Sequence, residues 1–343
     1  MPRRVVTFGE IMLRLSPPGF ERLLQSPMLV ATFGGGEANV AVCLAQFGLD
    51  SHYVTRLPAN AIGDAAVRAL RAEGVNTSHI VRGGNRVGIY YAETGASQRG
   101  GTVIYDRANS AISEMAPDAV DWDAVMAGAG WFHVTGITPA LGDKGAAATK
   151  ASVEAARRAG ARVSVDLNYR KKLWTPAQAQ AVMRPLMRDV DVVIANEEDL
   201  QSVLGVHVAE TDVTSGTLNV NAYRDAAEWV TKNLGPPMVA ITLRESLSAS
   251  DNGWSAVLWD GASGTLHQSQ HYSVRLVDRI GGGDSFAGGL IYGLVTGRTH
   301  EDALKFAVAA SALKQTIPGD FNRMSVAEVD ALAKGDASGR VQR

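Results

Sequence analysis

The chain alternates short apolar runs rich in β-branched residues with longer alanine-rich stretches of helical period. The short runs span residues 5–8, 52–55, 131–134, 162–166, 190–195 and 238–243, and the helical stretches include 37–47, 61–73, 144–159 and 222–233. Four helical stretches close on a glycine of the kind that ends helices, namely Gly48, Gly74, Gly160 and Gly235. This alternation predicts βαβ units and a largely parallel sheet, an α/β fold whose ligands bind at the carboxyl ends of the strands.

Composition excludes several classes of protein. A length of 343 residues exceeds one ordinary hydrophobic core, so we expect a large domain with a subsidiary element. A net charge of -2 argues against nucleic acid as a partner, and the single cysteine, Cys43, excludes an internal disulfide. Gly9 and Glu10 interrupt the N-terminus before a signal-length apolar stretch develops, and no run approaches the roughly 18 apolar residues that span a bilayer. We expect a cytoplasmic protein without a membrane partner.

One stretch breaks the alternation. Residues 86–93 and 101–107 are two strand-like runs joined by a polar, glycine-containing turn, which predicts an antiparallel hairpin. With the extended segment 11–15 it forms a small second sheet, either a lid that excludes water from a reaction or an ordinary surface excursion. Val103, Tyr105 and Arg107 share one face of the strand, so a lid would present a phenol and a guanidinium together.

Three consecutive glycines, Gly281 to Gly283, stand before Asp284, between a strand-like run at 272–277 and a helical run at 286–294. Successive glycine amides can converge on an anion, and the following helix adds its dipole. Asp284 is then either the cap of that helix or a general base for a hydroxyl nucleophile.

A second glycine cluster, residues 34–36, also enters a helix. It lacks the Gly-x-Gly-x-x-Gly spacing of dinucleotide sites, and the chain has no Gly-x-x-x-x-Gly-Lys-Ser/Thr phosphate loop. A nucleotide must therefore be held in another way, and a dinucleotide oxidoreductase is disfavoured.

Two strand-like runs end in polar residues, at 166–170 and at 196–199. Asparagine and acids there suit hydrated Mg²⁺ and phosphate, and Arg170 suits a phosphate or carboxylate. Asn196 and Asp199 also have the three-residue separation of a capping box, which is the structural alternative.

In this order the segments resemble the PfkB (ribokinase-like) carbohydrate kinases over nearly the whole chain. The N-terminal signature resembles residues 34–48 and the C-terminal signature residues 278–289. The resemblance implies a three-layer α/β/α domain with a mostly parallel sheet and a small β lid. The main domain would comprise 1–10, 36–85 and 112–330, the lid 11–35 and 86–111, and a flexible tail 331–343.

The resemblance also implies ATP and Mg²⁺ as cofactors and a set of site residues. Asp284 would be the catalytic base, and the amides of Gly281, Gly282 and Gly283 the anion hole. ATP would contact Asn168, Asn196, Thr242, Arg244, Gly281 and Gly283, although 242–249 lacks the Gly- and Lys-containing turn usual in the family. Mg²⁺ would be held through water by Asn196 and Asp199, the latter replacing the usual glutamate.

Within the family, residues 9–19, 278–284 and 317–320 most resemble the 2-keto-3-deoxygluconate kinases. That subgroup implies in-line transfer from ATP to a sugar acid held by Gly34, Gly35, Asn39, Tyr90, Tyr105, Arg107 and Arg170. A carboxylate substrate calls for arginine, since Arg makes paired, charge-assisted bonds to carboxylates. The alternative for Arg107 is a solvated charge on the hairpin.

Other readings stay open at this point. A kinase of the same fold acting on fructose, ribose or a nucleoside is one, and a non-catalytic sugar-acid binding protein is another. The residues do not decide between the gluconate and galactonate epimers, or whether a monovalent cation binds near Asp278, where Arg279 replaces the Thr or Ser of many members. Val87, Ile89 and Tyr91 predict an exposed apolar lid face and hence a homo-oligomer, with a dimer formed through the lid.

Overall fold

The computed structural model describes residues 4–208, 220–336 and 338–339. Within them, one large sheet has the strand order β13-β12-β11-β10-β9-β8-β1-β4-β5, and β14 also pairs with β12. The strands from β11 to β5 run parallel, whereas β12, β13 and β14 are antiparallel, so the predicted mostly parallel sheet is confirmed. Its strands are β1 (Arg4–Phe8), β4 (Asp50–Leu57), β5 (Ile80–Arg82), β8 (Ala129–Thr135), β9 (Arg162–Asp166), β10 (Val192–Ala195), β11 (Met238–Ser246), β12 (Asp251–Asp260), β13 (Thr265–Gln268) and β14 (Tyr272–Arg275).

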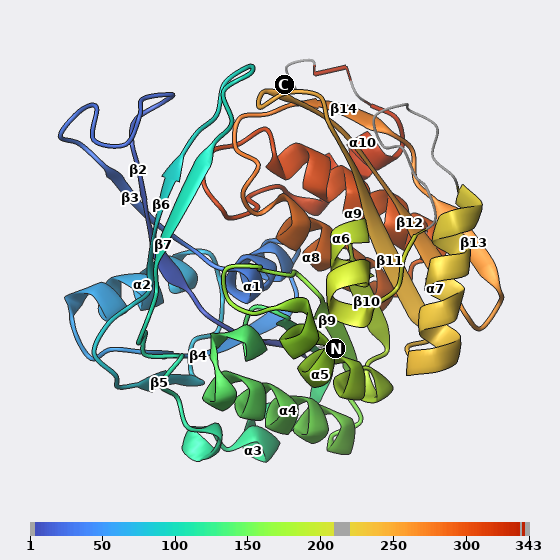
Figure 1. Ribbon diagram of the computed structural model, residues 1–343, viewed down its shortest axis with the longest axis horizontal. Helices are drawn as coiled ribbons and strands as arrows, with labels where there is room; N and C mark the ends of the chain where they lie inside the picture. The colour runs from blue at the N-terminus through green and yellow to red at the C-terminus, as the bar shows by residue number, and fades with distance from the viewer. Residues whose placement is uncertain (1–3, 209–219, 337, 340–343) are drawn as a thin grey trace.

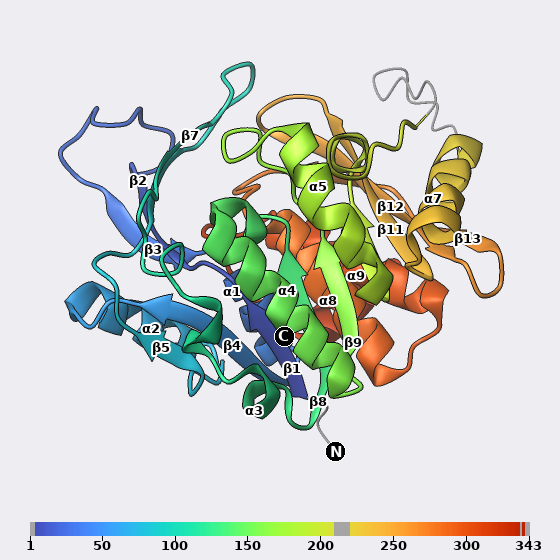
Figure 2. The same cartoon turned by 60° about the horizontal axis from the view of Figure 1, so that its bottom comes forward.

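Helices cover both faces of this sheet, as Figures 1 and 2 show. One layer contains α1 (Gly36–Gln46), α2 (Ala61–Ala72), α8 (Gly282–Thr296), α9 (His300–Lys314) and α10 (Val326–Ala333). The other contains α3 (Trp122–Met126), α4 (Asp143–Arg158), α5 (Pro176–Leu186) and α7 (Val220–Leu234). Buried aliphatic side chains fill the space between each layer and the sheet, so the predicted α/β/α architecture is confirmed. In the described residues, no helix combines the length and apolarity that a membrane span requires.

The glycines predicted to end helices do so. Gly48, Gly74, Gly160 and Gly235 all have positive φ, between 74° and 107°, directly after α1, α2, α4 and α7. At the other end of the chain, α10 extends into the segment assigned to the tail, of which residues 337 and 340–343 lie outside the described part.

The lid is a separate four-stranded sheet in the order β3-β2-β6-β7, seen at the left of Figure 1. Its strands are β2 (Met12–Ser16), β3 (Val30–Gly34), β6 (Ile89–Glu93) and β7 (Thr102–Asp106). The β6–β7 hairpin is antiparallel as predicted, and β2 joins it by parallel pairing with β6. The chain enters the lid from β1 and leaves it through β3 into α1, and these two crossings touch: a Cβ on Gly35 would lie 1.9 Å from the carbonyl oxygen of Glu10.

One lid prediction is wrong. Val87 lies before β6 begins and is only 6% exposed, because it packs against Ile11 in the cluster beneath the lid. Cross-strand pairing nevertheless gives the sheet an apolar outer face, opposite the face that carries Tyr90 and Tyr105. That outer face is formed by Leu13, Leu15, Ala31, Phe33, Ile89, Tyr91 and Ile104.

Candidate active site

A cavity of about 540 Å³ lies between the lid and the carboxyl ends of β9, β10 and β11. Most of the predicted site residues line it: Gly35, Asn39, Tyr90, Tyr105, Arg107, Asn168, Arg170, Asn196, Asp199, Thr242, Arg244, Gly281, Gly283 and Asp284. Gly34 and Gly282 lie behind this wall, where an added Cβ would meet Asp320 and Gln315 respectively. The fold therefore gathers residues from the two glycine clusters, the lid and the polar strand ends around one space.

Asp284 lies in the first turn of α8, which begins at Gly282 and not at the predicted Phe286. The N-cap is Gly281, in the left-handed region at φ 85°, so the capping alternative for Asp284 is wrong. A Cβ on Gly281 would lie 2.1 Å from the carbonyl oxygen of Asp320, and only glycine fits there. Glycine's low helix propensity hid this helix start from sequence reasoning, because tertiary packing overrides propensity.

The Asp284 carboxyl is oriented by α1. The amide nitrogen Nδ2 of Asn39 donates to Asp284 Oδ2 at 2.6 Å, while Asn39 Oδ1 accepts from the backbone N–H of Gly35 at 3.2 Å. Enclosure in the cavity wall raises the pKa of Asp284 to about 6, against the opposing effect of the Asn39 hydrogen bond. A carboxylate with such a pKa can accept a proton from a hydroxyl near neutral pH.

Asn196 and Asp199 form the predicted capping box at the start of α6 (Glu197–Asp199), which continues as a π-helical turn, Leu200–Leu204. The Asn196 side chain accepts from the Asp199 N–H at 2.9 Å, and Asp199 Oδ2 accepts from the Asn196 N–H at 3.1 Å. Asp199 Oδ1 accepts from the Tyr169 N–H at 2.8 Å. Asp199 thus fastens the loop after β9 to the end of β10 while it stays on the cavity wall.

Asp166, which belongs to the predicted polar strand ends but was not among the predicted site residues, ends β9 on the same wall. Its pKa lies well above the ordinary value because the carboxyl is buried and because Asp199 and Asp284 repel its charge. Burial also raises the pKa of Asp199. A group of buried oxygen donors with excess negative charge fits a hard divalent cation such as Mg²⁺. The sequence did contain a signal for Asp166, because this acid ends an apolar strand at the ligand-binding edge of the sheet.

A buried ion-pair network lies at the base of the lid, and of its three charged members only Asp320 lines this cavity. Arg14 on β2 contacts Asp278 Oδ2 through Nη2 at 2.7 Å and Asp320 Oδ1 through Nη1 at 2.8 Å. The Tyr90 hydroxyl donates to the other oxygen of Asp320, and the Tyr90 and Tyr105 rings lie 6.0 Å apart. Arg14, Asp278 and Asp320 were not predicted as site residues, because the pairing of groups so distant in sequence is invisible in one chain.

The two predicted arginines differ in their surroundings. Arg107 is 9% exposed and donates to Glu10 Oε2 through Nε at 2.8 Å and through Nη2, so the solvated-charge alternative is wrong. Arg170 donates from Nη1 to the carbonyl oxygen of Tyr169 at 3.0 Å. Of the ion pairs in the described part of the chain, none includes Arg170. Arg107 is therefore already neutralised, whereas Arg170 offers its charge to the cavity.

Most of the predicted adenosine segment, 242–249, continues the strand β11. β11 continues to Ser246 in antiparallel pairing with β12, which places the half-buried Thr242 and the exposed Arg244 on the cavity wall. The Thr242 hydroxyl donates to the carbonyl oxygen of Ala195 at 3.4 Å. β12 and β13 were not predicted.

Comparison with known proteins agrees with this arrangement. The model of the pfkB family carbohydrate kinases matches residues 2–324. The chain belongs to the pfkB family.

Relatives in the family extend over the full length. The crystal structure of 2-dehydro-3-deoxygluconokinase from Thermotoga maritima is 51% identical, with a TM-score of 0.93, and the match covers 97% of this chain and 100% of that one. The 2-dehydro-3-deoxygalactonokinase of Haloferax volcanii is 33% identical, over 99% of both chains. An Escherichia coli ribokinase II in complex with ATP and Mg²⁺ has a TM-score of 0.78, over 97% of this chain and 99% of that one. At 18% identity, this structural similarity shows a shared ribokinase-like fold and nothing more.

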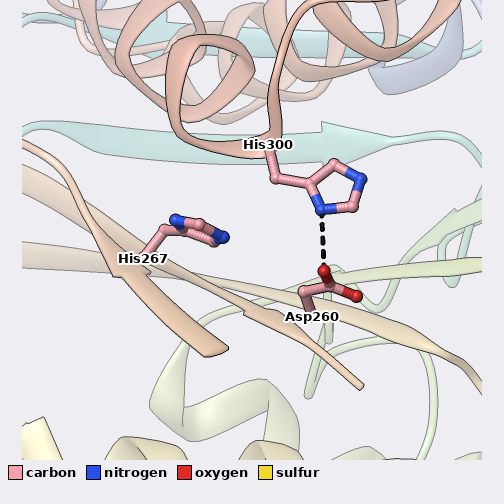
Figure 3. Close-up of side chains that lie close together, drawn as sticks. All are labelled: Asp260, His267 and His300. Carbon is pink, nitrogen blue, oxygen red and sulfur yellow. Dashed lines mark hydrogen bonds and ion pairs between the residues drawn. The ribbon is translucent and has the colours of Figure 1, made fainter. Parts of the chain in front are cut away.

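This pfkB family member has a second group of side chains of metal-binding types at the opposite edge of the sheet, formed by Asp260, His267 and His300 (Figure 3). Their ligand atoms lie within 4.8 Å of one another, and His300 Nδ1 is 3.1 Å from Asp260 Oδ2. The Asp260 carboxylate already accepts from the Ala262 N–H at 3.0 Å and from the Ser263 hydroxyl at 2.7 Å. These bonds close the β12–β13 turn, so we assign the group a structural role.

Proposed function

We propose that this protein phosphorylates 2-keto-3-deoxygluconate with ATP, giving 2-keto-3-deoxy-6-phosphogluconate. It would be a phosphotransferase with an alcohol group as acceptor. The observation that carries the proposal is the position of Asp284, at the start of a helix with glycines on the cavity wall, between an arginine-bearing lid and a group of buried carboxylates. The 51% identity to a protein named 2-dehydro-3-deoxygluconokinase supports the gluconate acid over its epimer.

In the mechanism we propose, the terminal hydroxyl of the sugar donates a hydrogen bond to Asp284 and attacks the γ-phosphorus of ATP in line. The bond between the γ-phosphorus and the β–γ bridging oxygen breaks, and ADP leaves. Asp284 takes the proton, and Asn39 holds the carboxylate in place. The developing charge meets the amides of Gly281 and Gly283 at the positive end of α8. The Gly282 N–H donates to the carbonyl oxygen of Arg279 at 3.3 Å. The anion hole would therefore consist mainly of the N–H groups of Gly281 and Gly283.

The phosphate side would be held by the polar strand ends. Asn196 and Asp199, beside Asp166, would hold Mg²⁺ through water, and the ion would neutralise phosphate charge. Asn168, whose backbone has φ 39°, and the β11 residues Thr242 and Arg244 would contact the nucleotide.

The sugar side would be the lid wall. Tyr90, Tyr105 and Arg107 would bind the sugar acid from the lid, and Arg170 would bind it from the loop after β9. Gly34 and Gly35 keep the backbone close to this space, since a Cβ on Gly34 would lie 2.0 Å from Asp320 Oδ2.

The test is a panel of acceptors with ADP release as the readout. The panel contains 2-keto-3-deoxygluconate, its galactonate epimer, fructose and ribose. We expect ADP release with the keto acids and much less with the neutral sugars, because arginine recognises a carboxylate. A preference for a neutral sugar would show another pfkB kinase, and saturable sugar binding without ADP release would show a binding protein.

Arginine variants sharpen this test. Arg107→Ala and Arg170→Ala should each raise KM for the keto acid about 10-fold or more while KM for ATP changes little, on the scale of a hydrogen bond to a charged group. Arg86→Ala is the matched control, since Arg86 lies at the same lid hairpin in an exposed pair with Asp106. Unchanged KM values for the sugar would remove both arginines from the site.

We also propose that the enzyme is cytoplasmic and that its main domain and lid have the boundaries that the sequence predicts. We propose further that it forms a homo-oligomer through the lid. The support is the apolar outer face of the lid, on which Ile104 is 49% exposed. Two copies packed face to face would bury it. Ile104→Lys should shift a dimer toward monomer in light scattering, and a monomeric wild-type protein would contradict the proposal.

A further inference from the structure

Lys314, which the mechanism above does not use, is fully buried at the last residue of α9. Its ammonium donates to the carbonyl oxygen of Asp278 at 3.2 Å and to that of Ile280. Both carbonyls belong to the loop that leads into Gly281. Burying an ammonium costs several kcal/mol unless its bonds compensate, so these contacts need an explanation.

The same end of α9 holds the rest of this loop. The Ser311 hydroxyl donates to the carbonyl oxygen of Gly282 at 2.7 Å. The carbonyl oxygen of Gln315 accepts from the N–H groups of Val277 at 2.9 Å and Asp278 at 3.2 Å. Lys314 is the charged member of this set, at a helix C-terminus where a cation is favoured.

Peptide geometry connects these contacts to the anion hole. The carbonyl of Ile280 and the N–H of Gly281 belong to one planar trans peptide, so they point in opposite directions. The carbonyl of Gly282 and the N–H of Gly283 are related in the same way. Lys314 and Ser311 each hold the carbonyl side of one of these two peptides. Holding each carbonyl on α9 aims the corresponding N–H away from α9, and both glycines line the cavity.

Carbonyl oxygens are also the ligands that an alkali cation receives in proteins. The nearby carboxylates are occupied, since Arg14 pairs with both Asp278 and Asp320. The ammonium therefore takes a position that a monovalent ion would otherwise suit.

We propose that Lys314 is a positioning residue, a built-in monovalent cation that aims the Gly281 amide at the transferred phosphoryl group with Ser311 aiming the Gly283 amide. The protein accordingly needs no added alkali cation. This inference rests on the anion hole of the proposed function.

The experiment replaces the charge and then returns it from solution. Lys314→Met keeps the length of the side chain and should lower kcat about 10-fold or more, somewhat less than the loss of an oxyanion-hole donor, with smaller changes in both KM values. K⁺ or NH₄⁺ should restore part of that kcat, while the wild-type rate should be the same in Na⁺, K⁺ and tetramethylammonium buffers. Lys305→Met, on the exposed side of α9 in a pair with Glu301, is the matched control and should behave as wild type.

Several results would overturn the inference. A Lys314→Met enzyme with normal kcat would do so, as would a loss that no cation restores and that accompanies lost sugar binding. If Lys314→Met does not fold, a wild-type enzyme stimulated by K⁺ overturns the inference and an indifferent one supports it. A wild-type protein inactive with every sugar acid overturns the proposed function as well, whereas an active wild type with an unaffected Lys314→Met overturns only this inference.

Discussion

The two walls of the cavity handle their charges in opposite ways. On the lid wall, Arg14 pairs with Asp278 and Asp320, and Arg107 pairs with Glu10. On the wall formed by the ends of β9 and β10, Asp166 has a pKa well above its ordinary value because the carboxyl is buried and because neighbouring carboxylates repel its charge. The charges on the lid wall are paired within the protein, whereas a cation would stabilise the carboxylates of the strand-end wall. The difference is consistent with the proposed function, in which the sugar lies against the lid wall and Mg·ATP against the strand ends.

The largest effect is expected at Asp284, which lies between the two walls. Asp284→Asn removes the proposed general base and should lower kcat at least about 10²-fold, with ATP affinity nearly unchanged. Steady-state kinetics and nucleotide binding by calorimetry measure the two quantities. Near-normal turnover would remove Asp284 from the mechanism and leave the two walls without a reacting centre.

The next effect concerns stability on the lid wall. Arg14→Leu leaves two buried carboxylates without their partner and should lower the free energy of unfolding by about 3–5 kcal/mol. The matched control is Arg82→Leu, because Arg82 and Asp64 form an exposed pair worth at most about 1 kcal/mol. Urea unfolding compares the two variants, and equal losses would mean that the lid wall is no more tightly paired than the surface.

The strand-end wall should respond differently. Asp166→Asn removes a repelled carboxylate, so the free energy of unfolding should not fall, but the Mg²⁺ concentration for half-maximal activity should rise about 10-fold. Asp320→Asn is the comparison on the lid wall and should destabilise the protein, because Arg14 loses one of its two charge partners. If the two variants behave alike, the proposed division of charges is incorrect.

The smallest effect is a pH dependence. The pKa of Asp284 is raised to about 6, so its protonated, inactive form persists to a higher pH than for an ordinary aspartate. The value of kcat/KM should therefore fall about tenfold per pH unit below about pH 6. The protonated form of Asp284 is favoured by the negative charges of Asp320 and Asp166 and disfavoured by the positive charges of Arg170 and Lys314. The profile of kcat/KM is measured from about pH 5 to about pH 8, a range that includes the ~6 of a tuned base. A flat profile would contradict the role of Asp284.

The sequence predicted the parts of this site that local patterns specify. Alternating periodicity located β9, β10 and β11, and the rule that parallel strands share a ligand-binding edge brought Asn168, Asn196 and Thr242 to one cavity. The period-2 face of the hairpin placed Tyr105 and Arg107 on its wall.

Long-range partners could not be predicted in this way. The sequence around Arg107 does not indicate that Glu10 is its partner, and the sequence around Arg14 does not indicate Asp320. Such pairs depend on how distant elements pack. The start of α8 was missed for a related reason, since Gly281 leaves room for Asp320 and Gly282 for Gln315, and both partners are distant in sequence. Nothing in the sequence around Lys314 indicates that this lysine is buried.

The close approach of Glu10 and Gly35 links the lid to Asp284, the proposed catalytic base. Both strands of the β2–β3 hairpin leave the main domain at this one crossing, so a tilt of the hairpin must pivot there. Gly35 donates its N–H to Asn39, and Asn39 holds Asp284. In the proposed mechanism, a displacement of the hairpin would reach Asp284 through these hydrogen bonds, so closure over a substrate would be coupled to alignment of the carboxylate.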